Sequence, residues 1–120
     1  MPNAKRILRV TIHHQNDDSS DTSWMGAFSN AEQAYVRMME YERGDFTFIG
    51  IYAKAEITLG GECCQDIRSG GLWRIESDSG KEYLAEVGTD ELAQLKQQLH
   101  AIGFGTRAIS AAFKNVVRPR

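Results

Sequence analysis

The chain has 120 residues, of which 42% are hydrophobic and 25% charged, and its net charge is -2. This length and composition are typical of one globular domain, so we expect a single domain over residues 1–120. The apolar runs are far shorter than the roughly twenty residues that span a bilayer, and the amino terminus lacks the apolar stretch of a secretory signal. Adjacent Cys63 and Cys64 would point to opposite faces of a strand, a poor geometry for a disulfide. These features favour a cytoplasmic protein with free thiols and no membrane partner.

The first segment alternates in the manner of a strand. Over residues 6–13, Leu8, Val10 and Ile12 fall on one face, which predicts a half-buried strand. The polar run over 15–23 has strong turn chemistry and predicts an exposed loop.

A helix signal and the longest alternating segment follow. We expect a helix to begin at Ala31, because capping-box spacing precedes it, and to end at Gly44. The segment from 46 to 59 alternates and predicts a strand, with an apolar face formed by Ile49, Ile51, Ala53, Ala55, Ile57 and Leu59. The opposite face of that strand begins apolar and ends polar, so only its first half should be covered on both sides.

Two glycine pairs punctuate the next segment. Gly60-Gly61 and Gly70-Gly71 can adopt the positive φ that two-residue hairpin turns require. Strands over 46–59, 62–68 and 72–77 are therefore predicted to form an antiparallel meander.

The last third of the chain has helical spacing. A short helical segment over 83–87 is expected to end at Gly88, and Thr89 to cap a stronger helix that stops at Gly103. Thr106 is predicted to cap a final helix.

Together these elements predict an α+β domain. Its antiparallel sheet would contain the meander and the N-terminal strand, packed with an internal helix and a C-terminal helix pair. The tail over 116–120 is expected to fray.

The C-terminal pair has the outline of a helix-turn-helix. Arg107, Ser110, Lys114 and Asn115 would face outward on its second helix, where phosphate and base-edge contacts are made. The competing interpretation is a common packing device, because residues 103–120 carry too few basic side chains for a convincing DNA footprint.

No motif predicts catalysis, a cofactor or a metal. Asp17, Asp18 and Asp21 could collect a hard cation, but their spacing does not match a calcium loop, and a solvated acidic loop is favoured. No Cys-x-x-Cys or His-x-x-x-His spacing is present. Glu76 and Asp78 fall on the same side of a strand, and we expect this pair to be solvated.

Three segments, over 41–57, 69–79 and 91–104, resemble a family of small uncharacterised proteins encoded by bacteriophages, prophages and plasmids. The resemblance covers residues 40–115 approximately and implies a mobile-element context in a bacterial host. It assigns no catalytic or binding residue. Between Trp24 and Ala31 this chain is shorter than members with a tyrosine- and proline-rich insertion.

The leading functional hypothesis is a non-catalytic interaction protein whose partner is a host protein, including a defence-system component such as a CRISPR effector or a restriction enzyme. Two surfaces are candidates: the acidic loop over 17–21, and the sheet face around Tyr52, Lys54, Glu56 and Arg74. The alternative is a DNA-binding regulator that uses the C-terminal helices. A homodimer formed through edge strands is a further possibility.

Overall fold

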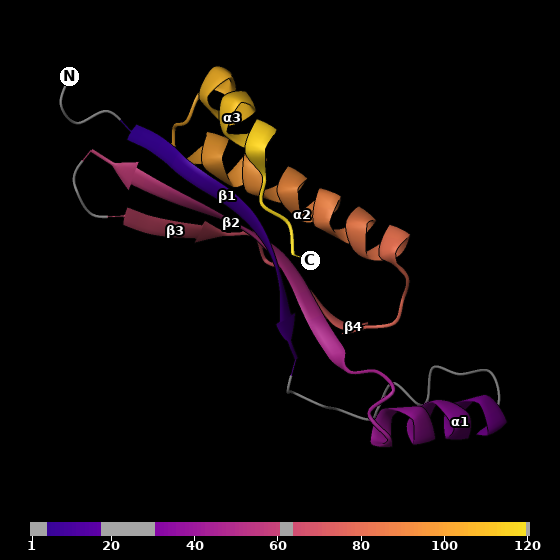
Figure 1. Cartoon of the computed structure of the whole chain (residues 1–120). Coiled ribbons are helices and arrows are strands. Elements are labelled where there is room, and N and C mark those ends of the chain that lie inside the picture. The colour runs from indigo at the N-terminus through magenta and orange to yellow at the C-terminus, as the bar shows by residue number, and fades with distance from the viewer. Residues whose placement is uncertain (1–4, 18–30, 61–63, 120) are drawn as a thin grey trace.

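The computed structural model describes residues 5–17, 31–60 and 64–119 (Figure 1). It confirms the α+β class, with an antiparallel sheet and three α-helices. In chain order the elements are β1 (Lys5–Asn16), α1 (Ala31–Glu42), β2 (Phe48–Leu59), β3 (Cys64–Arg68), β4 (Leu72–Glu76), α2 (Lys81–Ala101), α3 (Thr106–Ala112) and a 3-10 turn, η2 (Phe113–Asn115).

Strand β2 is the centre of the sheet. β1 pairs with one edge of β2 along its whole length, from Lys5 opposite Leu59 to Asn16 opposite Ile49. β3 and β4 both pair with the other edge, and every pairing is antiparallel. The sheet order is β1-β2-β3, in which β2 and β3 pair as expected for the meander over 46–68, and β4 then returns to β2.

The turn predicted at Gly70-Gly71 has a different role from a hairpin. Because β3 and β4 are both antiparallel to β2, they run in the same direction, one after the other along one edge. The break between them is held by Glu91 of α2, which is only 7% exposed. Glu91 Oε1 accepts hydrogen bonds from Ser69 Oγ and from the Gly71 backbone N–H, both at 2.7 Å. These bonds satisfy polar groups that the interrupted ladder leaves free.

Helix α2 covers one face of the sheet and forms the core with it. Ala53, Ala55 and Ile57 of β2 are fully buried against this helix, as are its own Leu95 and Leu99. Full burial of one such aliphatic side chain stabilises a fold by about 2 kcal/mol. This layer is therefore the main source of stability.

The predicted helix break at Gly88 is wrong, because α2 continues through it from Lys81 to Ala101. A Cβ at position 88 would lie 3.2 Å from Ile12 Cδ1, so the glycine permits a close approach of α2 to β1. Thr89 does not cap a new helix: its hydroxyl donates to the Ala85 carbonyl, 3.1 Å away. Among the described residues, no helix has both the length and the apolar character needed to cross a membrane.

A bulge in β1 changes which residues at its start face the core. The pairing with β2 shifts between Ile7 and Arg9, so Leu8 is the extra residue. Leu8 is consequently 46% exposed, whereas Val10 and Ile12 are buried as predicted. Ile7 packs against the core in its place.

The predicted stop at Gly103 is confirmed. Gly103 has φ +104°, and the Phe104 N–H donates to the Leu99 carbonyl at 3.0 Å, as in a Schellman-type helix end. The cap of α3 is one residue earlier than expected, because Gly105 occupies the N-cap position and Thr106 is the first helical residue.

The C-terminal tail, which was expected to fray, is held on β1 at Val117. Val117 forms a parallel bridge with β1: its N–H donates to Val10 O at 3.0 Å, and its carbonyl accepts from Ile12 N at 2.9 Å. The tail thereby covers the middle of the outer edge of β1, which limits pairing of that edge with a second chain.

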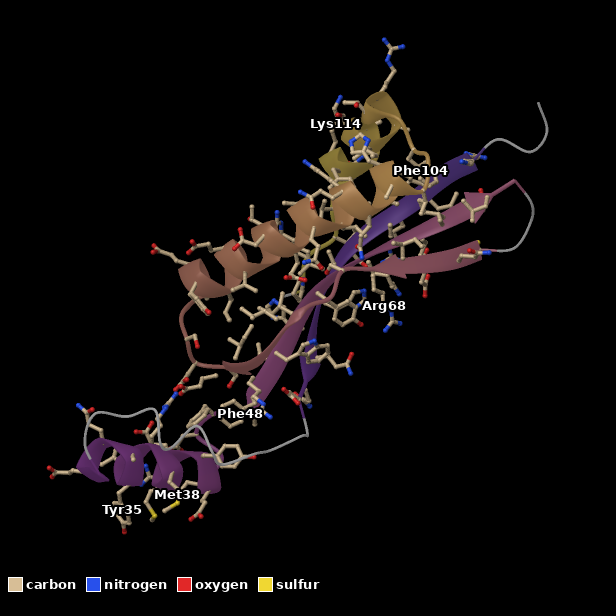
Figure 2. All side chains as sticks on the ribbon, turned by 180° about the vertical axis from the view of Figure 1, so that it is seen from behind. Tyr35, Met38, Phe48, Arg68, Phe104 and Lys114 are labelled. Carbon is tan, nitrogen blue, oxygen red and sulfur yellow. The ribbon has the colours of Figure 1, made fainter. Side chains whose placement is uncertain are left out.

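Helix α1 begins at Ala31, and Gly44 follows it with φ +80°, as predicted. It lies beyond the end of the sheet and does not pack on a sheet face (Figure 1). The molecule measures 64 × 25 × 24 Å, and its radius of gyration is 18.1 Å. A compact domain of this length would have a radius near ~14 Å. Figure 2 shows Tyr35 and Met38 on the side of α1 away from the sheet, and Tyr35 is 59% exposed.

Candidate functional site

The sheet has one covered face and one open face. Side chains alternate along β2, so the residues between Ala53, Ala55 and Ile57 point away from α2. In the part of the chain that the structure describes, no helix packs on this second side, which we call the open face. Its side chains are Arg9, Thr11 and His13 of β1, Tyr52, Lys54 and Glu56 of β2, Asp66 and Arg68 of β3, and Trp73 of β4.

Aromatic rings form a row across the open face. The His13 and Tyr52 rings are stacked, with centroids 5.0 Å apart and an angle of 11° between their planes. On β4, the centroid of the Trp73 ring lies 6.3 Å from that of Tyr52, with an angle of 26° between the two ring planes. The Arg68 guanidinium is 5.3 Å from the Tyr52 centroid, within range of a cation–π contact. Tyr52 is therefore buried by its neighbours, whereas Trp73 stays 42% exposed.

Gly50 makes room for Trp73. A Cβ on Gly50 would lie 1.9 Å from Trp73 Cε3, so the indole occupies the space above this residue. The β2–β4 pairing is irregular here, between Ile49 and Ile51. Arg74, next to the indole, has φ 60°, an unusual conformation for a residue with a side chain. The bulge aims Trp73 at the open face while Ile75 stays in the core.

The open face is positive, but its charges are mixed. Burial is the main cause that lowers the pKa of His13, and Lys54, Arg68 and Arg9 lower it further through their positive charges. Its Nε2 lies 2.8 Å from Thr11 Oγ1. Acidic side chains are interspersed with these bases, as in the Lys54–Asp66 pair, whose atoms are 3.9 Å apart.

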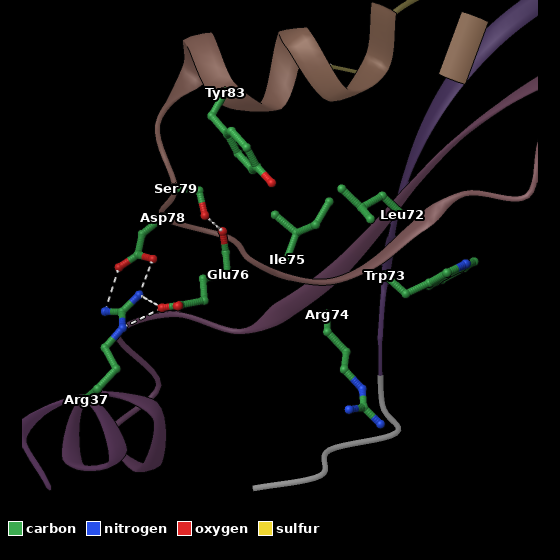
Figure 3. A pocket seen from close by; sticks show the side chains of 9 residues that line it. All are labelled: Arg37, Leu72, Trp73, Arg74, Ile75, Glu76, Asp78, Ser79 and Tyr83. Atoms are coloured by element: carbon green, nitrogen blue, oxygen red, sulfur yellow. Dashed lines mark hydrogen bonds and ion pairs between the residues drawn. The ribbon is translucent and has the colours of Figure 1, made fainter. Parts of the chain in front are cut away.

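The structure brings together three of the sheet residues singled out from the sequence, Tyr52, Lys54 and Glu56, on the open face. Arg74 does not join them. Its backbone N–H donates to Asp17 Oδ2 at 3.0 Å, and its side chain lines a groove on the α1 side of β4 (Figure 3).

Of the acidic loop over 17–21, the structure describes only Asp17. Asp17 accepts the bond from Arg74 and thus helps to hold the strained residue beside Trp73. Asp18 and Asp21 lie outside the described residues.

Sequence reasoning did not select His13, Arg68 and Trp73 as site residues. The alternation of β1 placed His13 on the polar face of its strand, which was a usable signal. The sequence around Trp73 contained no such signal, because the direction of its side chain depends on a bulge. A glycine inside the β2 strand pattern, Gly50, is the feature that could have indicated a close approach of another group.

A groove of about 660 Å³ separates α1 from the start of α2 (Figure 3). Arg37 of α1 closes one end of it. The Arg37 side chain donates to Glu40 at 2.7 Å, to Glu76 at 2.5 Å and to Asp78 at 2.6 Å, and it lies 3.6 Å from the Phe46 ring centroid. Glu76 and Asp78 remain partly exposed, as expected for a solvated pair, but both bind Arg37, which the sequence did not predict.

This cluster is better suited to holding α1 than to acid–base chemistry. The hydrogen bond from Arg37 holds the pKa of Asp78 below its usual value, because the guanidinium stabilises the carboxylate form. The same bonds raise the pKa of Arg37. Over the described ranges, no three His, Cys, Asp or Glu side chains gather closely enough to hold a metal ion.

The residues of the alternative site lie at the other end of the molecule. Arg107, Ser110, Lys114 and Asn115 are all exposed. Only the first two are on α3, a helix of seven residues, while Lys114 and Asn115 are in the 3-10 turn that follows. Ile109 of α3 is buried in the core. The helix pair thus packs beside the sheet and presents a mildly basic outer surface.

Comparisons with known proteins give no assignment. No protein-family model, curated protein or solved structure matches this chain.

Proposed function

We propose that this chain is a non-catalytic interaction protein that binds a partner protein on its open face. The observation that carries the proposal is that Trp73 and Arg68, both exposed, are held against the buried Tyr52 ring on a sheet face that the described helices leave uncovered. Trp, Tyr and Arg are the residue types that dominate the energetics of protein interfaces. The row is pre-organised by stacking, so little side-chain freedom would be lost on binding.

A protein partner fits this face better than a nucleic acid does. A nucleic-acid platform offers exposed ring faces to bases, but His13 and Arg68 occupy the space around the Tyr52 ring. A phosphate backbone would also meet two acids, Glu56 and Asp66, among the bases. Interspersed charges suit a protein surface, where each can find an opposite charge.

The resemblance to proteins of phages and plasmids suggests what the partner is. In that context the proposed partner is a protein of the bacterial host, and a component of a defence system, such as a CRISPR effector or a restriction enzyme, is the leading candidate. Occupying its binding surface would inhibit it. This part of the proposal rests on the resemblance alone, and the chemistry of the open face supports only the binding.

The test uses N-terminally tagged protein and nuclease-treated bacterial lysate, followed by affinity measurement with the purified partner. Trp73→Ala should weaken binding by about 30-fold, the effect of losing one hot spot. The charge reversal Arg68→Glu should also weaken it, whereas the matched reversal Arg107→Glu on α3 should not. Circular dichroism checks that each variant is folded.

Two outcomes would overturn the proposal. One is a partner whose affinity is unchanged by Trp73→Ala and Arg68→Glu. The other is loss of binding on nuclease treatment, which would make nucleic acid the real ligand.

The second candidate is duplex-DNA binding by the C-terminal helices, which the exposure of Arg107 and Lys114 favours. It predicts retention on DNA that falls steeply with salt and is reduced by Arg107→Ala and Lys114→Ala. Failure of DNA binding at low salt would exclude it.

A further inference from the structure

A second pocket lies on the covered side of the sheet. It has a volume of about 470 Å³ and sits between β1, the N-terminal half of α2 and the C-terminal tail, whose course Figure 1 shows. Its lining residues are Ile12, His14, Lys81, Leu84, Ala85, Gly88, Arg118 and Pro119. This volume is within the range of small-molecule sites in proteins, roughly 300–1,000 Å³.

The walls of this pocket are apolar. Ile12 and Gly88 are buried in the described structure, and Leu84 is half-buried. Gly88 contributes no side chain, and a Cβ there would already lie 3.2 Å from Ile12 Cδ1 and 4.0 Å from Arg118 Nη1. The glycine in the helical pattern of α2 thus lets Ile12 lie close against the helix and form the wall of the pocket.

Basic side chains from three different elements meet at the same pocket. Lys81 comes from the first turn of α2, Arg118 from the tail and His14 from β1. Among the described residues, none of those that line the pocket is acidic, and neither Lys81 nor Arg118 makes an ion pair. Burial lowers the pKa of His14, so at neutral pH its ring offers hydrogen bonds without a charge.

Lys81 lies in the first turn of α2, which also carries Glu82, a residue outside the lining of the pocket. The N-cap residue of α2 is Gly80, which provides no side-chain hydrogen bond to the first turn. The free N–H groups of a helix N-terminus favour an anion, and here they adjoin Lys81.

We propose that this pocket binds a small amphiphilic carboxylate. The apolar chain or ring of the ligand would lie against Ile12 and Leu84, while Lys81 and Arg118 would hold its carboxylate. The pocket and the open face are on opposite sides of β1, because Ile12 and His13 alternate along the strand. The two proposals therefore stand or fall separately.

The probe is octanoate, titrated into ¹⁵N-labelled full-length protein and followed by NMR. Saturable shifts are expected at the amides of Ile12, Leu84 and Gly88. Acetate, which lacks the chain, and octylammonium, which reverses the charge, should give none at equal concentration.

Variants identify the groups that bind. The double change Lys81→Gln and Arg118→Gln should weaken octanoate binding by about tenfold, as expected for two solvent-accessible ion pairs. The matched neutralisation Arg107→Gln should leave it unchanged. Ala85→Phe, on an exposed helix position, should block the pocket without touching the charges.

The absence of saturable shifts with octanoate would overturn the proposal. Equal binding of octylammonium would also overturn it, because the site would then be merely apolar. Unchanged octanoate affinity in the double variant would also overturn it, because Lys81 and Arg118 would then not hold the carboxylate.

Discussion

The sheet with α2 and the helix α1 are stabilised by different interactions. The sheet layer is held by fully buried aliphatic side chains, including Ile51, Ile57 and Leu95. Helix α1 is joined to it through the ion pairs of Arg37 with Glu76 and Asp78. The Tyr41 ring also contacts it, with centroids 5.7 Å from Phe46 and 5.3 Å from Phe48. Apolar burial resists salt and pH, whereas half-exposed ion pairs do not. We therefore expect the two parts to respond differently to the same perturbations.

The largest effect should come from Leu95→Ala in the sheet layer. Removing this fully buried side chain should lower the free energy of unfolding by about 3 kcal/mol, because lost burial and the cavity act together. Urea denaturation followed by circular dichroism measures it. Gln97→Ala, at an exposed position of the same helix, should change stability by less than about 0.5 kcal/mol. A similar loss in both variants would contradict the assignment of the core.

A smaller loss of stability is expected when the buried carboxylate of Glu91 is removed. Glu91→Ala should cost about 2 kcal/mol, because the Ser69 hydroxyl and the Gly71 N–H lose their buried acceptor. Glu91→Gln retains a carbonyl oxygen and should recover part of that loss. Glu86→Ala, an exposed position on α2, is the control. If Gln were no better than Ala in the same denaturation assay, the acceptor role would be refuted.

The α1 arm should respond locally to Arg37→Ala. Hydrogen exchange should speed up throughout residues 31–42, while the global free energy of unfolding changes by less than about 1 kcal/mol. In Arg37→Lys the exchange rates of α1 should lie between those of the wild type and Arg37→Ala, since lysine cannot make the forked bonds of a guanidinium. Arg43→Ala removes only an exposed pair with Asp45 and should leave exchange unchanged. A global loss as large as that of Leu95→Ala would mean that the arm is part of the core.

The weakest effect should be an acid transition confined to the arm. The folded pKa of Asp78 is below its unfolded value of about 3.9, so its contribution is complete above that pH and is lost as pH falls through the folded value. NMR signals of the Arg37 guanidinium should therefore stay constant from pH 7 to about 5 and shift at lower pH, where its carboxylate partners become protonated. Asp78→Asn should remove the part of this shift that comes from Asp78. A transition near neutral pH would instead show that another group causes the shift.

Local signals predicted three helix ends correctly. Capping spacing gave the start of α1 at Ala31, and the stops at Gly44 and Gly103 both have positive φ in the structure. Such positions depend on the conformation of one or two residues, so the sequence contains the necessary information. The alternation of β2 likewise brought Tyr52, Lys54 and Glu56 to one face.

The errors arose where a distant residue decides the local geometry. Gly88 looked like a helix break, but Ile12 of β1 explains why it has no side chain. Gly70-Gly71 looked like a hairpin, but Glu91 holds this segment as a break in an edge. Trp73 reaches the open face through a bulge opposite Gly50. None of these partners is near in sequence, so single-segment patterns could not reveal them.

The bridge between Val117 and β1 also bears on how the chain is made. β1 leaves the ribosome early, and β2 can pair with it soon afterwards, because β2 follows within the first half of the chain. The other edge of β1 obtains its partner only when Val117 emerges, almost last among the described residues. Throughout synthesis the Val10 and Ile12 region would therefore offer a free strand edge to chaperones or to other nascent chains.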